Sequence, residues 1–432
     1  MKKKFIFLFF ILYSFSVHAG IKNVKFDNGL TVLLKEDHRL KIVSIQLWVK
    51  VGSRNEDTTT SGISHLIEHM VFKGTQNYPC EVIQDEVEKR GGVINAGTSR
   101  DFTYFYVTLP TGQNNLSIGL DILFQMMRKA LFPEDELDRE KFVIAEEINR
   151  RWDNHQSYLW DLFNSVLYSC HPYSQPVLGT SESIRHISKE DILNYYNKFY
   201  VPANCTLVVV GDFKERDIII LTQRIFGGER FFQPSKTVDE TKVEPIARKN
   251  LEIERPVHQA YLIFGTAGPD AVDDDCYSMD ILSYILGKGR YSRLYRKLRE
   301  EKRLVWSVDC SFLTQKEKGP FYISIECNPD KIPLVKEIIF QELKRISNEL
   351  VSDDEIKRAK SMFETGYLLD VETYSGEAFN LGYYQTIGSY KIALEYLGKI
   401  LKVTSRSMQR VARKYFNPQN FISVMIMPPG EK

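Results

Sequence analysis

His65-Leu66-Ile67-Glu68-His69 is the stretch of this sequence that carries the most information. Two histidines four residues apart project from the same side of a helix, so both rings can reach one metal ion. Glu68 lies on the same side, where its carboxylate can take a proton from a metal-bound water. We therefore predict a helix here, with N-caps offered by residues 58–61 and an end near Lys73-Gly74. A surface helix that carries these residues by chance is the alternative.

A third ligand is needed, because catalytic zinc is held by three protein ligands and keeps one open position. The helix predicted over residues 133–152 carries Glu140 and Glu147, which are two turns apart and share a face. Val143 and Ile144 indicate that this face is turned inward, where an isolated carboxylate is costly. We predict Glu147 as the third Zn²⁺ ligand and Glu140 as the carboxylate that orients a ligating histidine. Salt bridges to the neighbouring arginines are the alternative.

The N-terminus is typical of a secretory signal peptide. Lys2-Lys3-Lys4 precedes an apolar run over residues 5–17, and Val17-His18-Ala19 is a small-residue cleavage site. We predict that residues 1–19 are removed and that the mature protein is exported, to the periplasm or beyond, with no stable membrane span. An uncleaved anchor is the alternative.

Charge and cysteine content exclude some classes of protein. Removing the predicted signal peptide takes away three lysines and no acids, so the formal charge moves from +1 to −2. A near-neutral chain has no electrostatic basis for binding nucleic acid. The six cysteines have no metal-finger spacing. Cys310 and Cys327 flank a predicted hairpin and are the first candidates for a disulfide; free or buried thiols are an equal alternative.

The sequence repeats itself. Tyr200-x-Pro202-x-Asn204 and Phe416-x-Pro418-x-Asn420 each precede an apolar strand, and their asparagines are 216 residues apart. The same offset carries His65 onto Ile281, in a second strand-turn-helix segment. It carries Glu68 and His69 onto Tyr284 and Ile285, so the second copy lacks the metal box. We predict a duplicated domain in which only the first copy is catalytic.

Strands joined by both hairpins and helices favour an α+β fold. In the first half, the strand over residues 42–51 alternates apolar and polar positions, and Asn28-Gly29 is a hairpin signal. We predict two tandem homologous domains, each a mainly antiparallel sheet with helices on one face. The boundaries are residues 20–235 for the catalytic zinc-binding domain, 236–250 for a linker and 251–432 for the non-catalytic domain.

The chain resembles the pitrilysin/insulinase family of inverted-motif zinc peptidases, in its short, processing-peptidase-like branch. The resemblance rests on GISHLIEHMVFKGT at residues 62–75 and EKFVIAEE at residues 140–147. GGVINAGT at residues 91–98 resembles the family's substrate strand, and the SRL and LRE elements at residues 292–300 resemble its second half. The resemblance covers essentially residues 21–430.

The resemblance implies a zinc endopeptidase in which two chains close as a clamshell around a small unfolded peptide. Glu68 would be the general base. Asn95 and Ala96 would lie on an edge strand to which the substrate adds as a further strand. The family holds the substrate carbonyl with an Arg/Tyr pair in the second half. Here Arg299 is present, but Trp306 stands at the tyrosine position, and an indole has no hydroxyl.

The sequence leaves open both the assembly of the chain and whether it is an active enzyme. A partner chain with an intact Arg/Tyr pair would complete the site in a heterodimer, and a homodimer that uses Arg299 alone is the alternative. A catalytically weak or inactive structural or peptide-binding subunit is the second functional hypothesis, because fold alone does not fix function.

Overall fold

The 216-residue repeat of the sequence is also a repeat of secondary structure. The computed structural model describes residues 16–18, 20–80, 82–112, 114–169, 171–229 and 250–429. Helix α7 (Lys189–Phe199) and helix α14 (Ser405–Tyr415) are offset by 216 residues at both ends. The short 3-10 turns η3 (Pro202–Asn204) and η6 (Pro418–Asn420) have the same offset. The prediction of two tandem homologous α+β domains is confirmed.

The first half contains these further strands and helices: β1 (Ser16–His18), β2 (Ile21–Lys25), β3 (Thr31–Glu36), β4 (Ile42–Val49), η1 (Ser53–Asn55), α1 (Ile63–Met70), α2 (Val82–Glu88), β5 (Val93–Thr98), β6 (Thr103–Pro110), α3 (Asn115–Arg128), α4 (Glu134–Asp153), α5 (His155–Leu167), η2 (Pro172–Ser174), α6 (Ser181–His186), β7 (Cys205–Gly211) and α8 (Glu215–Phe226). The second half contains β8 (Asn250–Glu254), β9 (Ala260–Ala267), α9 (Asp275–Gly287), the π-helix η4 (Tyr295–Glu301), β10 (Val305–Phe312), β11 (Pro320–Cys327), η5 (Pro329–Lys331), α10 (Ile332–Asn348), α11 (Asp353–Asp370), α12 (Tyr374–Ile387), α13 (Tyr390–Lys402) and β12 (Ile422–Met427).

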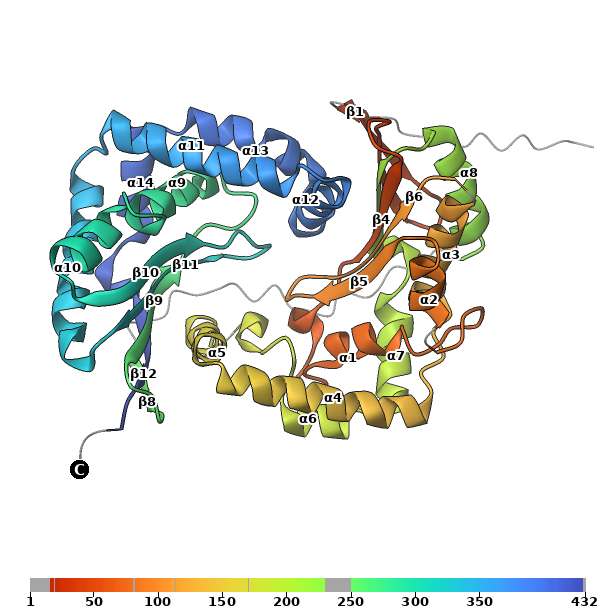
Figure 1. The fold of residues 1–432 in the computed structure, drawn as a ribbon, viewed down its shortest axis with the longest axis horizontal. Coiled ribbons are helices and arrows are strands. Elements are labelled where there is room, and N and C mark those ends of the chain that lie inside the picture. The colour runs from red at the N-terminus through yellow and green to blue at the C-terminus, as the bar shows by residue number, and fades with distance from the viewer. Residues whose placement is uncertain are drawn as a thin grey trace, which may run out of the picture.

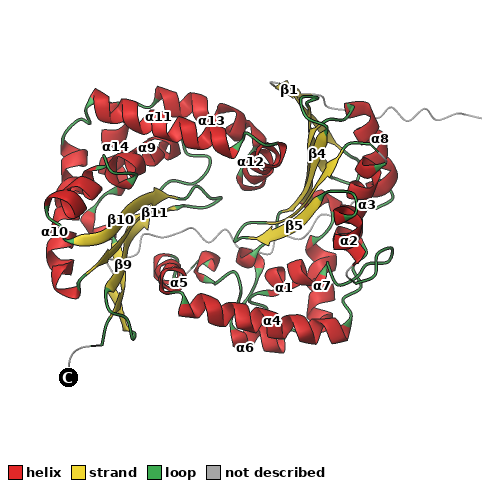
Figure 2. Ribbon diagram, in the orientation of Figure 1, coloured by secondary structure: helices red, strands yellow, loops and turns green. Residues whose placement is uncertain are grey.

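Each half is built on one mixed, mainly antiparallel sheet. The strand order is β1-β2-β3-β7-β4-β6-β5 in the first half and β10-β11-β9-β12-β8 in the second. Each sheet has one parallel pair, β3 with β7 and β8 with β12. Strands β5 and β10 are therefore edge strands at equivalent places. Figure 2 shows the two sheets on either side of the molecule's centre, with most helices outside them and α5 and α12 between them.

The two halves exchange helices. Helix α5 of the first half packs on β9 and β12 of the second sheet, and α12 of the second half packs on β4 and β7 of the first (Figure 1). Leu159 and Phe163 of α5 belong to a core with Ile263 and Val424. Because each helix leaves its own half, each sheet is covered on both faces.

The prediction that helices cover one face of each sheet is wrong, because this exchange also buries the other face of β4. Ser44, Gln46 and Trp48 are all buried. The Gln46 side-chain amide donates to the Ser375 carbonyl on α12, at 2.9 Å, and its oxygen accepts from the Trp48 indole. The alternation itself is correct, but its polar side faces α12 rather than water.

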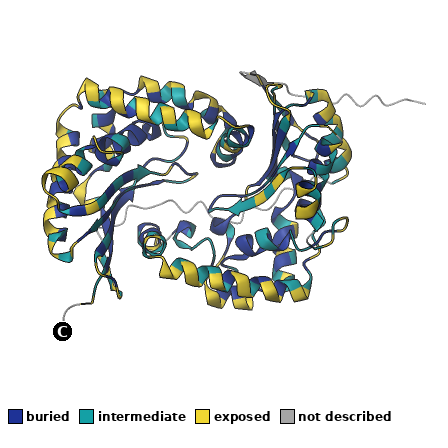
Figure 3. Cartoon of the chain, in the orientation of Figure 1, coloured by how far each residue is buried: buried dark blue, intermediate teal, exposed yellow. Residues whose placement is uncertain are grey.

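Exposed residues gather on the outward faces of α4, α6, α10 and α11 (Figure 3). None of the helices in the described part of the chain is both long enough and apolar enough to span a bilayer.

Some sequence predictions fall outside the described residues. These are the linker at 236–249 and residues 1–15 and 19 of the signal peptide; residues 16–18 form β1, which pairs with β2. The Cys310–Cys327 disulfide is not formed. Both residues are on the paired strands β10 and β11, but Cys310 stands opposite Ile323 and Cys327 opposite Val305.

The contact between α12 and β4 should be sensitive to one added methyl group. A Cβ atom on Gly382 would lie 2.1 Å from the Trp48 indole nitrogen, inside a fully buried contact. We expect Gly382→Ala to lower the free energy of unfolding by about 1–3 kcal/mol, because overpacking forces neighbours to move. Gly398→Ala on α13 is the matched control. Nothing lies within 4 Å of its added Cβ, so that change should be neutral or stabilise by about 0.5–1 kcal/mol. Equal urea-unfolding curves for the two variants would contradict this account of the interface.

Candidate metal centre

Helix α1 presents the two histidines on the side opposite its core face. Ile63, Leu66, Ile67 and Met70 are buried in the first-half core. This face fixes the rotation of the helix, so that His65 and His69 point away from the sheet's centre and toward α4.

The cap of α1 comes from a residue that the sequence analysis missed. The side-chain carboxylate of Glu56 accepts hydrogen bonds from the backbone N–H groups of Gly62, at 2.7 Å, and Ser64, at 2.9 Å. The prediction that residues 58–61 cap the helix is wrong, because the chain enters through Gly62 in a left-handed conformation with φ of 91°. Burial raises the pKa of Glu56 to about 7, although both hydrogen bonds favour the ionised form.

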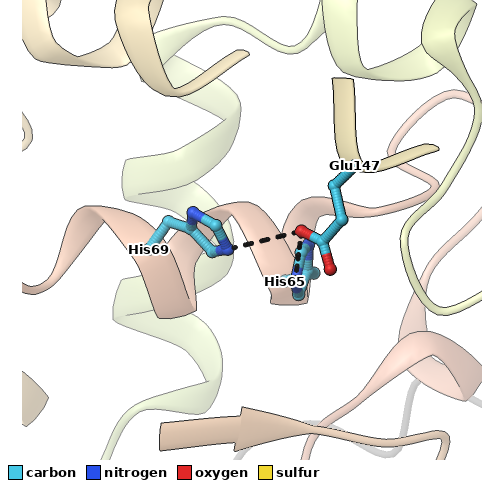
Figure 4. A group of neighbouring side chains, drawn as sticks. All are labelled: His65, His69 and Glu147. Carbon is cyan, nitrogen blue, oxygen red and sulfur yellow. Dashed lines mark ion pairs between the residues drawn. The ribbon is translucent and has the colours of Figure 1, made fainter. Parts of the chain in front are cut away.

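Three predicted ligands meet between α1 and α4. The Nε2 atoms of His65 and His69 lie 3.8 Å and 3.9 Å from the same carboxylate oxygen of Glu147. One donor atom from each residue lies within 4.8 Å of the others. Figure 4 shows both rings turned toward the Glu147 carboxylate, which descends from α4.

The 3.8 Å and 3.9 Å distances to Glu147 fit a shared zinc ion. Nitrogen and oxygen ligands sit about 2.0–2.2 Å from zinc, so two donors that share the ion are at most about 4.4 Å apart. Burial, and then the neighbouring His69, lower the pKa of His65 to about 3. His65 is therefore neutral at ordinary pH, which is the form that binds a metal.

Glu140 lies where a carboxylate can orient His69. Its two oxygens lie 2.9 Å from His69 Nδ1 and 2.7 Å from the Lys73 ammonium. The hydrogen bond with His69 lowers the pKa of Glu140 to about 2, against its burial and with help from Lys73. This contact leaves His69 Nε2 to face Glu147. Lys73 is a second residue that the sequence analysis missed as a site residue, although it stands four residues after His69 and thus one turn further on.

The face of α4 that carries these acids is narrower than predicted. Leu137, Glu140 and Ile144 are buried, but Val143 is 41% exposed. At 3.6 residues per turn, Val143 lies at the margin of the buried stripe, so it does not mark the inward face.

Glu68 lies on the same helix as the histidines and is held by a neighbouring strand. The Thr98 hydroxyl donates to its Oε2 at 2.5 Å. Burial raises the pKa of Glu68, and the nearby Glu147 adds to this, while Thr98 acts in the opposite direction. Thr98 ends β5, in the segment that the sequence analysis linked to substrate, but its own role was not predicted.

The remaining predicted residues lie on both sides of the molecule. Asn95 and Ala96 are on the edge strand β5, with Asn95 exposed. Arg299 and Trp306 lie on the second half, outside the histidine cluster. The guanidinium carbon of Arg299 is 5.3 Å from the Tyr295 ring, and Trp306 is 48% exposed at the start of β10.

Comparisons with known proteins show the family of the chain. Residues 31–181 match the family model for insulinase, peptidase family M16, and residues 186–363 match the model described as the peptidase M16 inactive domain. An uncharacterized zinc protease of Rickettsia felis is 30% identical over 400 residues, covering 91% of this chain and 94% of that protein. The chain belongs to the insulinase family, peptidase family M16. The zinc protease PqqE of Helicobacter pylori is 27% identical, over 94% of this chain and 93% of its own.

Solved structures share the fold along most of the chain. A crystal structure of a protease from Helicobacter pylori superposes with a TM-score of 0.88 at 26% identity, covering 94% of this chain and 99% of that one. A structure from Pseudomonas fluorescens described as a peptidase M16 inactive domain has a TM-score of 0.85 at 20% identity, over 95% and 99% of the two chains. This second likeness bears on the fold alone.

Removing the carboxylate that contacts His69 should weaken metal binding. We expect Glu140→Gln to lower zinc affinity about 10–100-fold, the usual effect of losing such a partner. Zinc competition with a chromophoric chelator measures this directly. Glu146→Gln is the matched control on the same helix, because Glu146 is exposed and outside the cluster. An unchanged affinity in Glu140→Gln would show that His69 needs no support from α4.

Proposed function

We propose that this chain is a zinc-dependent endopeptidase that cleaves small unfolded peptides. The observation that carries the proposal is the convergence of His65, His69 and Glu147 beside Glu68. Helix α1, which carries Glu68, packs against the edge strand β5. The family and its relatives named as zinc proteases support the class of reaction.

The chemistry divides between the metal and the protein's own groups. A zinc ion held by His65, His69 and Glu147 would supply the Lewis acid that brings the pKa of a water to about 7 and polarises the scissile carbonyl. The Glu68 carboxylate, oriented by Thr98, accepts the proton of the attacking water and returns it to the leaving amine nitrogen. Its raised pKa favours the first transfer, because a more basic carboxylate is a better acceptor for the proton of the water.

Strand β5 supplies the orientation. Its outer backbone edge is unpaired in the sheet, and Asn95 is exposed on it. An extended peptide added along this edge would pass beside α1, which packs against β5. Recognition of this kind reads the peptide backbone first, so sequence preference should be loose.

A catalytically weak subunit of a heterodimer is the second candidate. Trp306 favours it, because an exposed indole at this position lacks the hydroxyl of the family's Arg/Tyr pair, and Arg299 alone remains in this half. A related partner chain would then donate the missing pair.

Export of the mature protein after residue 19 is also part of the proposed function and rests on the N-terminal sequence.

The base can be tested apart from the metal. Glu68→Gln should keep one zinc ion per chain and lower kcat for a mixed-peptide substrate by about 10²–10⁴-fold, the usual contribution of a general base. Zinc content by atomic emission and cleavage with and without chelator are the measurements. Zinc retention with undiminished cleavage would sink the catalytic role of Glu68.

The second candidate makes a different prediction. If Trp306 limits the chain, Trp306→Tyr should raise kcat of the isolated protein about tenfold or more, since one hydrogen-bond donor to a developing oxyanion is worth at least that much. Trp152→Tyr, at an exposed tryptophan of α4, is the matched control and should change nothing. An unchanged rate in Trp306→Tyr would remove the case for an obligatory partner with an Arg/Tyr pair.

A further inference from the structure

The second half contains a cavity of about 510 Å³ among α9, α11, α12 and α13. We call this cavity the second-half pocket. It does not correspond to the metal centre of the first half, because Ile281, Tyr284 and Ile285, the counterparts of His65, Glu68 and His69, are not among the described residues that line it.

Aromatic residues make up half of the described lining of the second-half pocket. Six of the described residues that line it are aromatic. Phe363, Tyr367 and Tyr396 have centroids 6.0–6.5 Å apart and planes within 17° of one another. They form a surface of nearly parallel rings. The faces of such rings carry negative potential and attract organic cations.

The charged groups of the pocket have one sign. Asp280 is buried on α9 and accepts a hydrogen bond from the Tyr396 hydroxyl at 2.5 Å. Asp370, at the end of α11, is exposed. Among the described lining residues there is no lysine, arginine or histidine. Burial raises the pKa of Asp280 to about 7, against the hydrogen bond from Tyr396, so an entering cation would supply the missing countercharge.

The second-half pocket lies close to the first sheet. Phe379 of α12 lines it, is 37% exposed, and has its ring 5.3 Å from that of Tyr104. Tyr104 is on β6, beside the edge strand β5. Figure 1 shows α12 between the helices of the second half and the first sheet.

We propose that the second-half pocket binds an organic cation, the ammonium or guanidinium end of a basic side chain in the peptide that the enzyme holds. The aliphatic stem lies against the aromatic rings, and the cation meets Asp280 at the base. Its volume is within the range of sites for small ligands. The inference that the cation belongs to a peptide rests on the proposed function. The inference that the pocket prefers a cation does not.

Binding to the full-length Glu68→Gln protein tests the proposal without turnover. The probes are fluorescent 12-residue peptides that carry one lysine at successive positions, each paired with a norleucine version. We expect lysine at one position to bind about tenfold more tightly than norleucine, the scale of one hydrogen bond to a charged group. Asp280→Asn should abolish this advantage. Asp354→Asn, an equal charge change at the exposed start of α11, should keep it.

A second variant guards against a folding defect in Asp280→Asn. Phe379→Leu removes one ring at the exposed rim and should reduce the lysine advantage about threefold. The proposal is overturned if lysine has no advantage at any position, or if the advantage survives both pocket variants. N-acetyl-lysine methylamide is the second probe; if it binds as tightly as the lysine peptides, the source is a free amine and not a peptide. Loss of the peptidase proposal with an intact lysine advantage would leave the pocket assignment standing.

Discussion

Packing of α12 against the first sheet is the contact on which the rest of the molecule depends. A sheet that is apolar on both faces must be covered on both, and here the second cover comes from the other half. Trp48 of β4 meets Gly382 of α12 with no room for a side chain. The same sheet carries β6 and the edge strand β5, and α1 packs against both. Helix α12 thereby supports the first sheet, which carries the proposed peptide-binding edge and against which the metal-binding helix α1 packs.

The two halves share one fold but differ at the place of the metal centre. In the first half, carboxylates and imidazoles converge between α1 and α4, and the Glu140 carboxylate lies behind one candidate ligand, His69. In the second half, Tyr284 and Ile285 stand at the positions of Glu68 and His69, and the Tyr284 ring lies 5.5 Å from that of Phe363 on α11. Apolar and aromatic side chains therefore take the place of the metal-binding groups in the second copy.

The sequence predicted what local periodicity encodes and missed what tertiary contacts decide. Helical spacing was enough to pair His65 with His69 on α1 and Glu140 with Glu147 on α4, because both helices are regular; the ligand count of zinc then joined the two pairs. The Glu56 cap was missed, since a carboxylate six residues before Gly62 reaches it only through a specific loop. Burial of Gln46 was missed because the helix that covers it lies about 330 residues further along the chain. The prediction that Val143 marks the inward face of α4 is wrong. The buried stripe of this helix is narrow and includes Glu140 and Ile144 but not Val143.

The exchange of α5 and α12 also has a consequence for how the protein is made. While the ribosome has delivered only the first half, the Trp48 face of its sheet stands bare, because the helix that closes it begins at residue 374. During that interval the nascent chain exposes an apolar surface that the complete protein buries. The two halves therefore complete their folding together. Separating them would leave two fragments, each with an apolar sheet face exposed, in place of two independent domains.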